Sequence, residues 1–170
     1  RSYGVEIEGR IKDLNGLSLN SSLTLVRSEF KDYNGELIPS AWDNRYIFLS
    51  TASKRFNKNW TVGVKFRFLG GLPYTPYDLE KSARVEAWDT RGGPFQDNSR
   101  INEKRFKPFQ QLDVRVDREF FFDKWSLNLY LDVQNVYNFQ AEQKDIILLE
   151  RKENGEPVIS NGKYQLRRVD

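Results

Sequence analysis

The chain has 170 residues, with 27 Lys and Arg against 24 Asp and Glu, and its net charge of +3 is spread along the sequence without a basic cluster. This length allows one domain with a core, and the dispersed charge excludes a basic nucleic-acid-binding surface, so no nucleic acid is expected as a partner. The absence of His and Cys excludes Ser-His triads, His-containing zinc sites and thiolate chemistry, and we expect no enzyme, no metal site and no cofactor.

Six segments alternate apolar and polar residues with the period of two that is typical of β-strands. In the clearest of them, WTVGVKFRF at 60–68, every second residue from Trp60 is apolar, while Lys65 and Arg67 lie on the other face. The pattern predicts strands, in chain order, at 3–12, 17–25, 44–56, 60–72, 110–122 and 125–134. Each strand therefore has one apolar and one polar face.

The connections between these strands alternate in length. Short turns are expected at 14–16, 57–59 and 123–124, and long irregular segments at 31–43, 73–109 and from 138 onward. Prolines and a Gly92-Gly93 pair argue against a long helix in the second long segment, and the last one has two stretches that could pair as a hairpin around Asn154-Gly155. In an up-and-down meander, alternate connections lie at the same end. One end would then carry tight turns and the other long loops, as in outer-membrane barrels.

The apolar faces could meet a protein core or a lipid bilayer, because periodicity alone does not distinguish the two. Aromatic residues favour lipid, since they gather near both ends of the strands, as the interfacial girdles of a transmembrane barrel do. The girdle candidates are Phe56, Trp60, Phe120 and Trp125 at the short-turn end and Tyr46, Tyr74 and Tyr137 toward the long loops. Lys65 and Arg67 would then face the lumen, because each would cost roughly 2–4 kcal/mol on the lipid side near the midplane.

Two observations limit this interpretation. In a small soluble barrel the polar rows would face water at no cost, so the charges alone leave that alternative open. Lys54 and Arg118 also interrupt the apolar rows. Both lie toward the short-turn end, where a long side chain can reach the lipid headgroups.

Five stretches carry further motifs in a fixed order. They are SYGVEIEGR at 2–10, IPSAWDNRY at 38–46, FRFLGGLPYTPYD at 66–78, FQQLDVRVDREF at 109–120 and WSLNLYLDVQNVYN at 125–138. In this order they resemble the C-terminal barrel segment of TonB-dependent outer-membrane receptors. The most specific pieces are GGLPYTP, similar to the family's Gly-x-Pro-Tyr-Thr-Pro, and LDVQNVYN, similar to its Asn-(Val/Leu)-(Tyr/Phe)-Asn strand end.

The resemblance implies an all-β, antiparallel, up-and-down transmembrane β-barrel of about 22 strands, closed by an N-terminal plug. Residues 1–170 would form an arc of about six spanning strands, with the plug, the early strands and the last strand outside it. The family imports a scarce nutrient, such as an iron chelate, cobalamin or a glycan, across the bacterial outer membrane. The implied partners are the rest of the receptor, the energising TonB complex acting through the N-terminal part, outer-membrane lipid and, in the glycan-importing branch, a surface lipoprotein.

Two groups of side chains are candidate binding residues. The polar rows would face the plug and seat it through ion pairs, or they would only hydrate the lumen. These candidates are Glu6, Glu8, Arg10, Lys12, Lys65, Arg67, Asp113, Arg115, Asp117, Glu119 and Asp132. On the outer loops, Trp42, Trp88 and Phe95 could stack on a sugar ring or hold a chelate. Paired acids also suggest a glycosidase, but the period of two explains these carboxylates without catalysis.

Two other classes of function stay open. A soluble antiparallel barrel or sandwich that binds a small ligand or carbohydrate would bury the apolar rows in a core and dissolve without detergent. A structural or adhesive barrel would have neither a plug nor a TonB box.

Overall fold

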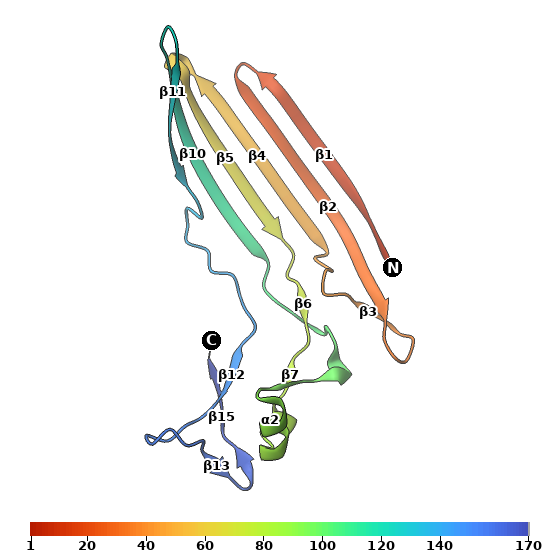
Figure 1. Cartoon of the computed structure of the whole chain (residues 1–170). Coiled ribbons are helices and arrows are strands. Elements are labelled where there is room, and N and C mark those ends of the chain that lie inside the picture. The colour runs from red at the N-terminus through yellow and green to blue at the C-terminus, as the bar shows by residue number, and fades with distance from the viewer. Residues whose placement is uncertain (170) are drawn as a thin grey trace. The chain divides into compact units, whose positions relative to one another are not determined.

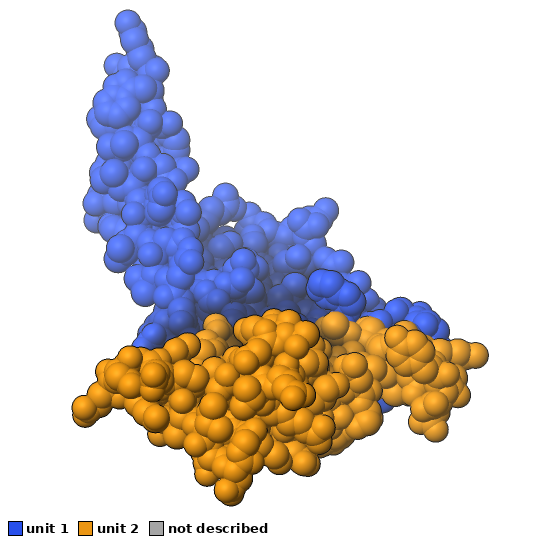
Figure 2. Space-filling view, turned by 60° about the horizontal axis from the view of Figure 1, so that its bottom comes forward, with its two compact units in different colours: residues 1–29, 42–72, 107–141 blue, residues 30–41, 73–106, 142–170 orange. Residues whose placement is uncertain are grey.

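The computed structural model describes residues 1–169, which form two compact units (Figure 2). Unit 1 contains Arg1–Glu29, Trp42–Leu72 and Lys107–Ala141; unit 2 contains Phe30–Ala41, Pro73–Phe106 and the segment from Glu142 onward. The segments of unit 2 correspond closely to the three long connections that the sequence predicts. Strands predominate and all their pairings are antiparallel, which confirms the all-β class.

Unit 1 is a single antiparallel sheet (Figure 1). Its main strands are β1 (Ser2–Leu14), β2 (Leu17–Lys31), β4 (Tyr46–Phe56), β5 (Trp60–Leu69), β10 (Phe109–Phe121) and β11 (Ser126–Val133). They are hydrogen-bonded in chain order, and the short β3 (Leu37–Pro39) pairs with β2. Within residues 1–169, β1 pairs only with β2 and β11 only with β10, so the sheet has two free edges and does not close.

All six predicted strands and the three predicted tight turns are confirmed, with ends shifted by a few residues. β2 runs furthest beyond expectation, to Lys31 instead of residue 25. The first turn needs two residues with positive φ, and Asn15 and Gly16 supply them at 52° and 82°. The second is the 3₁₀ turn η1 (Asn57–Asn59), where Lys58 and Asn59 also have positive φ.

The cross-strand registers place the apolar rows of all six strands on one face of the sheet. One row runs through Ile11, Leu19, Ala52, Val64, Val114 and Val133. This face is uncovered at both edges, where Ile7 is 64% exposed and Leu131 67%. The buried hydrophobic residues of the described chain, Trp88, Ile147 and Tyr164, all belong to unit 2. Unit 1 therefore has a continuous apolar face but no core of its own.

Unit 2 consists of short elements. Its strand pairs are β6 (Pro73–Tyr74) with β9 (Lys104–Arg105), β7 (Tyr77–Asp78) with β8 (Phe95–Gln96), β12 (Ile146–Leu149) with β15 (Leu166–Val169), and β13 (Ile159–Ser160) with β14 (Lys163–Tyr164). Its helices are α1 (Leu79–Ser82), α2 (Val85–Arg91) and the 3₁₀ turn η2 (Asn98–Arg100). The prediction that no long helix fills 73–109 is confirmed, although the sequence analysis did not anticipate the two short helices.

A small core holds unit 2 together. Trp88 from α2, Ile147 from β12 and Tyr164 from β14 are buried against one another, with Tyr77 and Leu149 among the residues packed around them. The Tyr164 hydroxyl donates a hydrogen bond of 2.9 Å to Asp89 Oδ1. This bond to a carboxylate raises the pKa of Tyr164.

The hairpin that could form around Asn154-Gly155 is present but short. Arg151 and Pro157 form an isolated bridge across that turn, and the Val158 N–H donates to the Glu150 backbone oxygen at 2.8 Å. The longer pairing, of β12 with the more distant β15, encloses both this turn and the inner hairpin β13–β14, which turns at Asn161-Gly162, where both residues have positive φ. Ile147 of β12 and Tyr164 of β14 pack together in the core of unit 2.

Gly70 provides a test of the packing where β5 ends, because its backbone lies against the residues that lead into β4. A Cβ at this position would stand 1.8 Å from the backbone oxygen of Asn44. We expect Gly70→Ala to lower the free energy of unfolding by about 1–3 kcal/mol, because neighbouring backbone would have to move. Urea unfolding of the native polypeptide in detergent, followed by tryptophan fluorescence, measures the loss.

Gly63→Ala is the matched control on the same strand. The nearest atom to its added Cβ is 3.9 Å away, so the free energy of unfolding should change by less than about 0.5 kcal/mol. Equal losses for the two variants would contradict the observed packing at Gly70.

Candidate functional site

Charged residues of three neighbouring strands meet on the polar face of the sheet. Lys65 of β5 is the register partner of Asp113 of β10, and Arg115 of β10 is the partner of Asp132 of β11. Arg67 lies on the same face, two residues after Lys65 on β5, and Asp117 lies there two residues after Arg115 on β10. The structure thus brings together six of the residues predicted to face a plug.

Asp113 is the centre of this group. Its Oδ2 accepts a hydrogen bond from Arg67 Nη2 at 3.2 Å, and its Oδ1 accepts one from Gln111 Nε2 at 2.7 Å. The backbone N–H of Asn135 also donates to Oδ1, at 2.9 Å. Three donors hold the carboxylate in one orientation, so it also fixes the chain that follows β11.

Arg115 forms a second, neighbouring interaction. Its Nε and Nη2 donate to the Asp117 carboxylate at 2.7–3.0 Å, and its guanidinium carbon lies 3.9 Å from the centre of the Tyr130 ring. The pairing with Asp117 runs along one strand, since these side chains lie two residues apart. One edge of the guanidinium and one of its faces are therefore occupied within the sheet.

A groove of about 240 Å³ lies among these side chains. Gly63 helps to form its floor, because the absence of a side chain leaves a gap in the polar row. Lys65 and Asp132 line the groove, and neither makes a salt bridge within residues 1–169. The groove thus offers one cation and one anion to a partner, an arrangement that suits docking of a polar segment better than catalysis.

The other predicted plug-facing residues lie apart from this group. Glu6, Glu8 and Arg10 are on β1, the opposite edge strand, and are exposed without a salt bridge in the described chain. Arg10 and Lys12 line a separate hollow of about 360 Å³. The lumen candidates therefore form two groups, one on β5, β10 and β11 and one on β1.

The predicted short-turn girdle is gathered at one end of the sheet. Phe56 and Trp60 are cross-strand partners, and Trp125 stacks on Phe122 with ring centroids 4.0 Å apart. Phe120 lies in the same region, with Arg118 packed over its ring. These aromatic side chains come from β4, β5 and β10 and from the turn between β10 and β11.

The two charged residues that the sequence analysis found in the apolar rows, Lys54 and Arg118, both have a local explanation. The Arg118 guanidinium lies over the rings of Trp60 and Phe120, 5.0 Å and 4.6 Å from their centroids. Lys54 Nζ donates to the backbone oxygen of Asn15 in the first tight turn, at 2.6 Å. Both side chains reach the short-turn end, as predicted, although their partners are protein groups.

The three aromatic residues predicted to form a girdle toward the long loops lie in different environments. Tyr46 stacks on Phe68 in unit 1, with ring centroids 5.7 Å apart, and Tyr137 is exposed after β11. Tyr74 belongs to unit 2, where it stacks on Phe106 at 4.4 Å. The structure therefore gathers only part of this predicted set on the sheet.

The three predicted ligand aromatics have different environments. Trp42 is 79% exposed, in unit 1, whereas Trp88 is buried in the core of unit 2. Phe95 is half-buried, with Lys81 and Arg91 over its ring at 4.6 and 4.8 Å. Of these three side chains, only Trp42 is mostly exposed.

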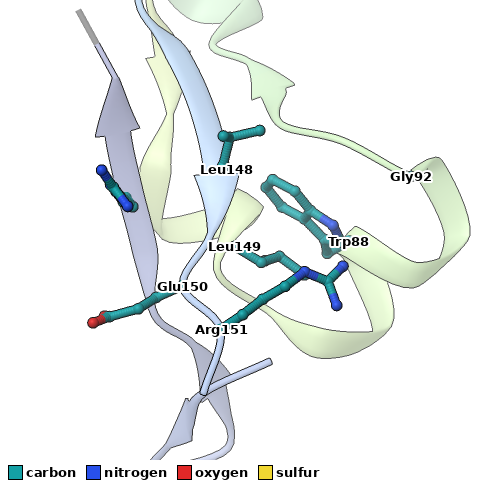
Figure 3. Close-up of a pocket in the computed structure, with 7 residues that line it drawn as sticks. Trp88, Gly92, Leu148, Leu149, Glu150 and Arg151 are labelled. Carbon is teal, nitrogen blue, oxygen red and sulfur yellow. The ribbon is translucent and has the colours of Figure 1, made fainter. Parts of the chain in front are cut away.

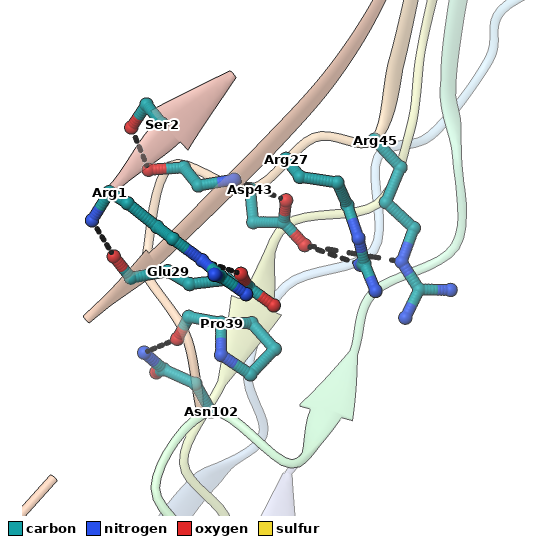
Figure 4. A network of polar contacts seen from close by, with 9 residues as sticks. Arg1, Ser2, Arg27, Glu29, Pro39, Asp43, Arg45 and Asn102 are labelled. Atoms are coloured by element: carbon teal, nitrogen blue, oxygen red, sulfur yellow. Dashed lines mark hydrogen bonds and ion pairs between the residues drawn. The ribbon is translucent and has the colours of Figure 1, made fainter. Parts of the chain in front are cut away.

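The sequence analysis missed a buried carboxylate at Asp43 (Figure 4). Its side chain is fully buried and accepts hydrogen bonds from the Ser28 backbone N–H at 2.9 Å and from Arg27 Nη1 at 3.2 Å. Arg45 Nε lies 4.0 Å from the same carboxylate. These contacts tie the segment before β4 to β2. Asp43 lies outside the period-two pattern, so no periodicity indicated its burial.

No protein family, curated protein or solved structure matches the chain. Within residues 1–169 no group of three His, Cys, Asp or Glu side chains could hold a metal ion. The described helices, at most seven residues long, are too short to cross a membrane.

Asp43 gives a stability test of this charge arrangement. Asp43→Asn keeps the shape but removes the buried charge that faces two arginines, so we expect the free energy of unfolding to fall by about 1–3 kcal/mol. Urea unfolding of the native polypeptide measures it. In the control, Asp13→Asn weakens a solvent-exposed pair with Arg55 and should cost less than about 1 kcal/mol. A larger loss at Asp13 than at Asp43 would refute the structural role assigned to Asp43.

Proposed function

We propose that this chain is an arc of the transmembrane β-barrel of a TonB-dependent receptor in the bacterial outer membrane. The receptor would import a scarce nutrient, such as an iron chelate, cobalamin or a glycan, with energy from the TonB complex. The observation that carries the proposal is the apolar face that crosses six strands in register without a covering layer. The ordered motifs that resemble this family, from SYGVEIEGR to LDVQNVYN, support the same proposal.

The free edges of the sheet support a larger barrel. Unpaired N–H and C=O groups of an edge strand cannot be accommodated in hydrocarbon, where no water satisfies them. Both β1 and β11 have such an edge within the described chain. The proposal therefore requires further strands of the same receptor beside each of them.

Strand length is also consistent with a tall barrel wall. β1 and β10 have 13 residues each and β2 has 15, whereas about 9–11 residues suffice to cross a bilayer. The excess would extend the wall beyond the membrane. Strands joined alternately by tight turns and by long connections fit the short periplasmic turns and long outer loops of such a barrel.

The polar face would then line the lumen and meet the plug. Lys65 and Asp132 are available there for partners of opposite charge, while Arg67, Asp113, Arg115 and Asp117 are already paired within the sheet. A plug segment that carries both an acid and a base would satisfy the two free charges. The outer loops would contact the nutrient and, if the receptor belongs to the glycan-importing branch, a surface lipoprotein.

Lipid contact can be tested with single cysteines on neighbouring positions of one strand. Val64→Cys and Leu131→Cys lie on the apolar face, while Lys65→Cys and Asp132→Cys lie on the polar face. We expect a nitrobenzoxadiazole label at 64 or 131, on the native polypeptide in nanodiscs, to be quenched by nitroxide-bearing lipid. The label at 65 or 132 should not be quenched, because it faces the lumen.

The same experiment distinguishes the transporter from the alternative, a soluble protein. If the native polypeptide remains in the soluble fraction and no label responds to lipid nitroxide, the apolar face meets protein and the transporter proposal fails. Equal quenching at neighbouring positions would mean that the two faces are not segregated, which also contradicts the proposal.

The proposed plug contact predicts an effect of charge reversal at Lys65. Lys65→Glu should weaken plug seating, because it removes the free cation from the groove and places a second acid beside Asp113. Planar-bilayer conductance of the whole receptor, measured as urea displaces the plug, should rise at a lower urea concentration. Lys124→Glu, in the exposed turn before β11, is the control and should leave the profile unchanged. Identical profiles for both variants would show that Lys65 only hydrates the lumen.

A further inference from the structure

Arg118 of β10 is a cation on the apolar face of the sheet that has no acidic partner. The register places it beside Trp60 of β5 and Leu129 of β11. The side chain is half-buried, and its Nε atom is buried without a hydrogen-bond partner. No acid within residues 1–169 forms an ion pair with it. The terminal nitrogens of this guanidinium, Nη1 and Nη2, are therefore available to an acceptor from outside the described chain.

Two aromatic rings hold the Arg118 guanidinium in place. Its central carbon lies 5.0 Å from the Trp60 ring centroid and 4.6 Å from that of Phe120. A cation is attracted to the face of an aromatic ring, and this contact orients the guanidinium without using its N–H donors, which lie in the plane of the group. Arg118 also lies close to the end of β10 at Phe121. The cation is thus presented within the predicted girdle at the short-turn end.

The charges around Arg118 leave it uncompensated. Its neighbours along β10, Asp117 and Glu119, lie on the polar face, because side chains alternate along a strand. Asp117 is also paired with Arg115. On the apolar face of β4, β5, β10 and β11, the charged residues are Lys54 and Arg118, and no position of that face in these four strands has an acid. This part of the apolar face therefore carries a net positive charge.

A hollow of unit 2, between α2 and β12, also has arginines near an aromatic ring, but they do not converge (Figure 3). Arg151 extends toward Trp88. Arg167 is the register partner of Leu148, so it lies on the opposite face of the β12–β15 pair from Arg151. Trp88 itself is only 9% exposed. An aromatic setting and free guanidinium donors coincide instead on the sheet, at Arg118.

We propose that Arg118 binds the phosphate of an anionic phospholipid at the membrane interface. A guanidinium suits a phosphate, because its planar N–H groups can donate two parallel hydrogen bonds to the phosphate oxygens. The acyl chains lie on the apolar face beside Val62 and Val116, one row further from the short turns. A zwitterionic headgroup is a poorer partner, since these strands offer no acid on this face to its ammonium group. The inference rests on the proposed function, which places lipid on the apolar face.

Lipid retention by the native polypeptide tests the site without a variant. The receptor is purified in detergent and mixed with equal amounts of phosphatidylglycerol and phosphatidylethanolamine that have the same acyl chains. Native mass spectrometry then identifies the first bound lipid. We expect phosphatidylglycerol to be retained about tenfold more often, because the ammonium group of phosphatidylethanolamine would lie near two cations. Equal retention, or retention of neither lipid, would overturn the proposal.

A second arm of the experiment separates a lipid from free phosphate. A large excess of inorganic phosphate should leave phosphatidylglycerol bound, because free phosphate has no acyl chains to lie on the apolar face. Displacement of the lipid by inorganic phosphate would mean that the site recognises the free anion, and it would overturn the assignment to a phospholipid.

Substitutions locate the bound lipid. Arg118→Gln should lower the retention of phosphatidylglycerol about tenfold, and Arg118→Lys should restore part of it, because an ammonium group keeps the charge without the planar fork. Lys124→Gln, in the exposed turn before β11, is the matched control and should change retention less than about twofold. Urea unfolding checks that the variants stay folded. Equal losses for Arg118→Gln and Lys124→Gln would indicate general attraction by charge, and unchanged retention in Arg118→Gln would place the lipid elsewhere; either result rejects the site.

This inference and the proposed function can fail separately. If nitroxide-bearing lipid quenches the labels of Val64→Cys and Leu131→Cys but phosphatidylglycerol is not preferred, lipid covers the apolar face and only the Arg118 site is rejected. If no label is quenched, the transporter proposal fails and this site fails with it.

Discussion

The apolar face of the sheet is the constraint on which the rest of the structure depends. Burial of apolar surface contributes about 25 cal/mol per Å², yet no layer of the described chain covers the rows from β1 to β11. A sheet with such a face in water would be held mainly by its ladder hydrogen bonds. Contact with lipid would satisfy the face, but it would also forbid the free edges of β1 and β11. Under the proposed function, lipid must therefore cover the apolar face and further strands must pair with the edges of β1 and β11. Either one without the other would leave apolar surface or backbone groups unsatisfied.

The distribution of charge follows from the same constraint. On the polar face, Asp113 accepts three hydrogen bonds and Arg115 is paired with Asp117, so charges are oriented by their neighbours even where solvent reaches them. On the apolar face, Arg118 is packed between two aromatic rings and Lys54 is bonded to a turn. A cation is tolerated there only near the end of a strand, where its long stem reaches a polar group. The two faces thus differ in what holds their charges: other polar and charged side chains on one, and aromatic rings and the backbone of a turn on the other.

The sheet could be predicted from the sequence because its strands and tight turns are specified by residues that are close together along the chain. The alternation of apolar and polar residues specifies the face on which each side chain lies, and residues such as Asn15 and Gly16 specify the tight turns. Strands joined by a tight turn must be neighbours, so the order of the strands follows the order of the chain. Asp43 could not be predicted, since its burial depends on Ser28 and Arg27, which lie on a strand that ends well before it. The β12–β15 pairing could not be predicted for a related reason: it encloses both Asn-Gly turns, and Ile147 of β12 packs against Trp88, which is distant in the sequence. For the candidate site, periodicity identified the charged residues, but only the register showed which of them meet.

Unit 2 is held by few buried side chains, and its connection to the sheet explains how so small a core can suffice. The segment Pro73–Phe106 leaves from β5 and returns to β10, which are hydrogen-bonded neighbours, and Phe30–Ala41 similarly joins β2 to β4. Closing a chain between adjacent strands fixes its two ends in advance, so the sheet carries part of the entropic cost of ordering the loop. Residues within these segments are then free of the period-two rule and of the need to build a large core. Side chains such as Arg151, in the segment after β11, can therefore differ in chemistry without affecting a strand of unit 1, and connections carried by a rigid scaffold are where binding residues usually lie.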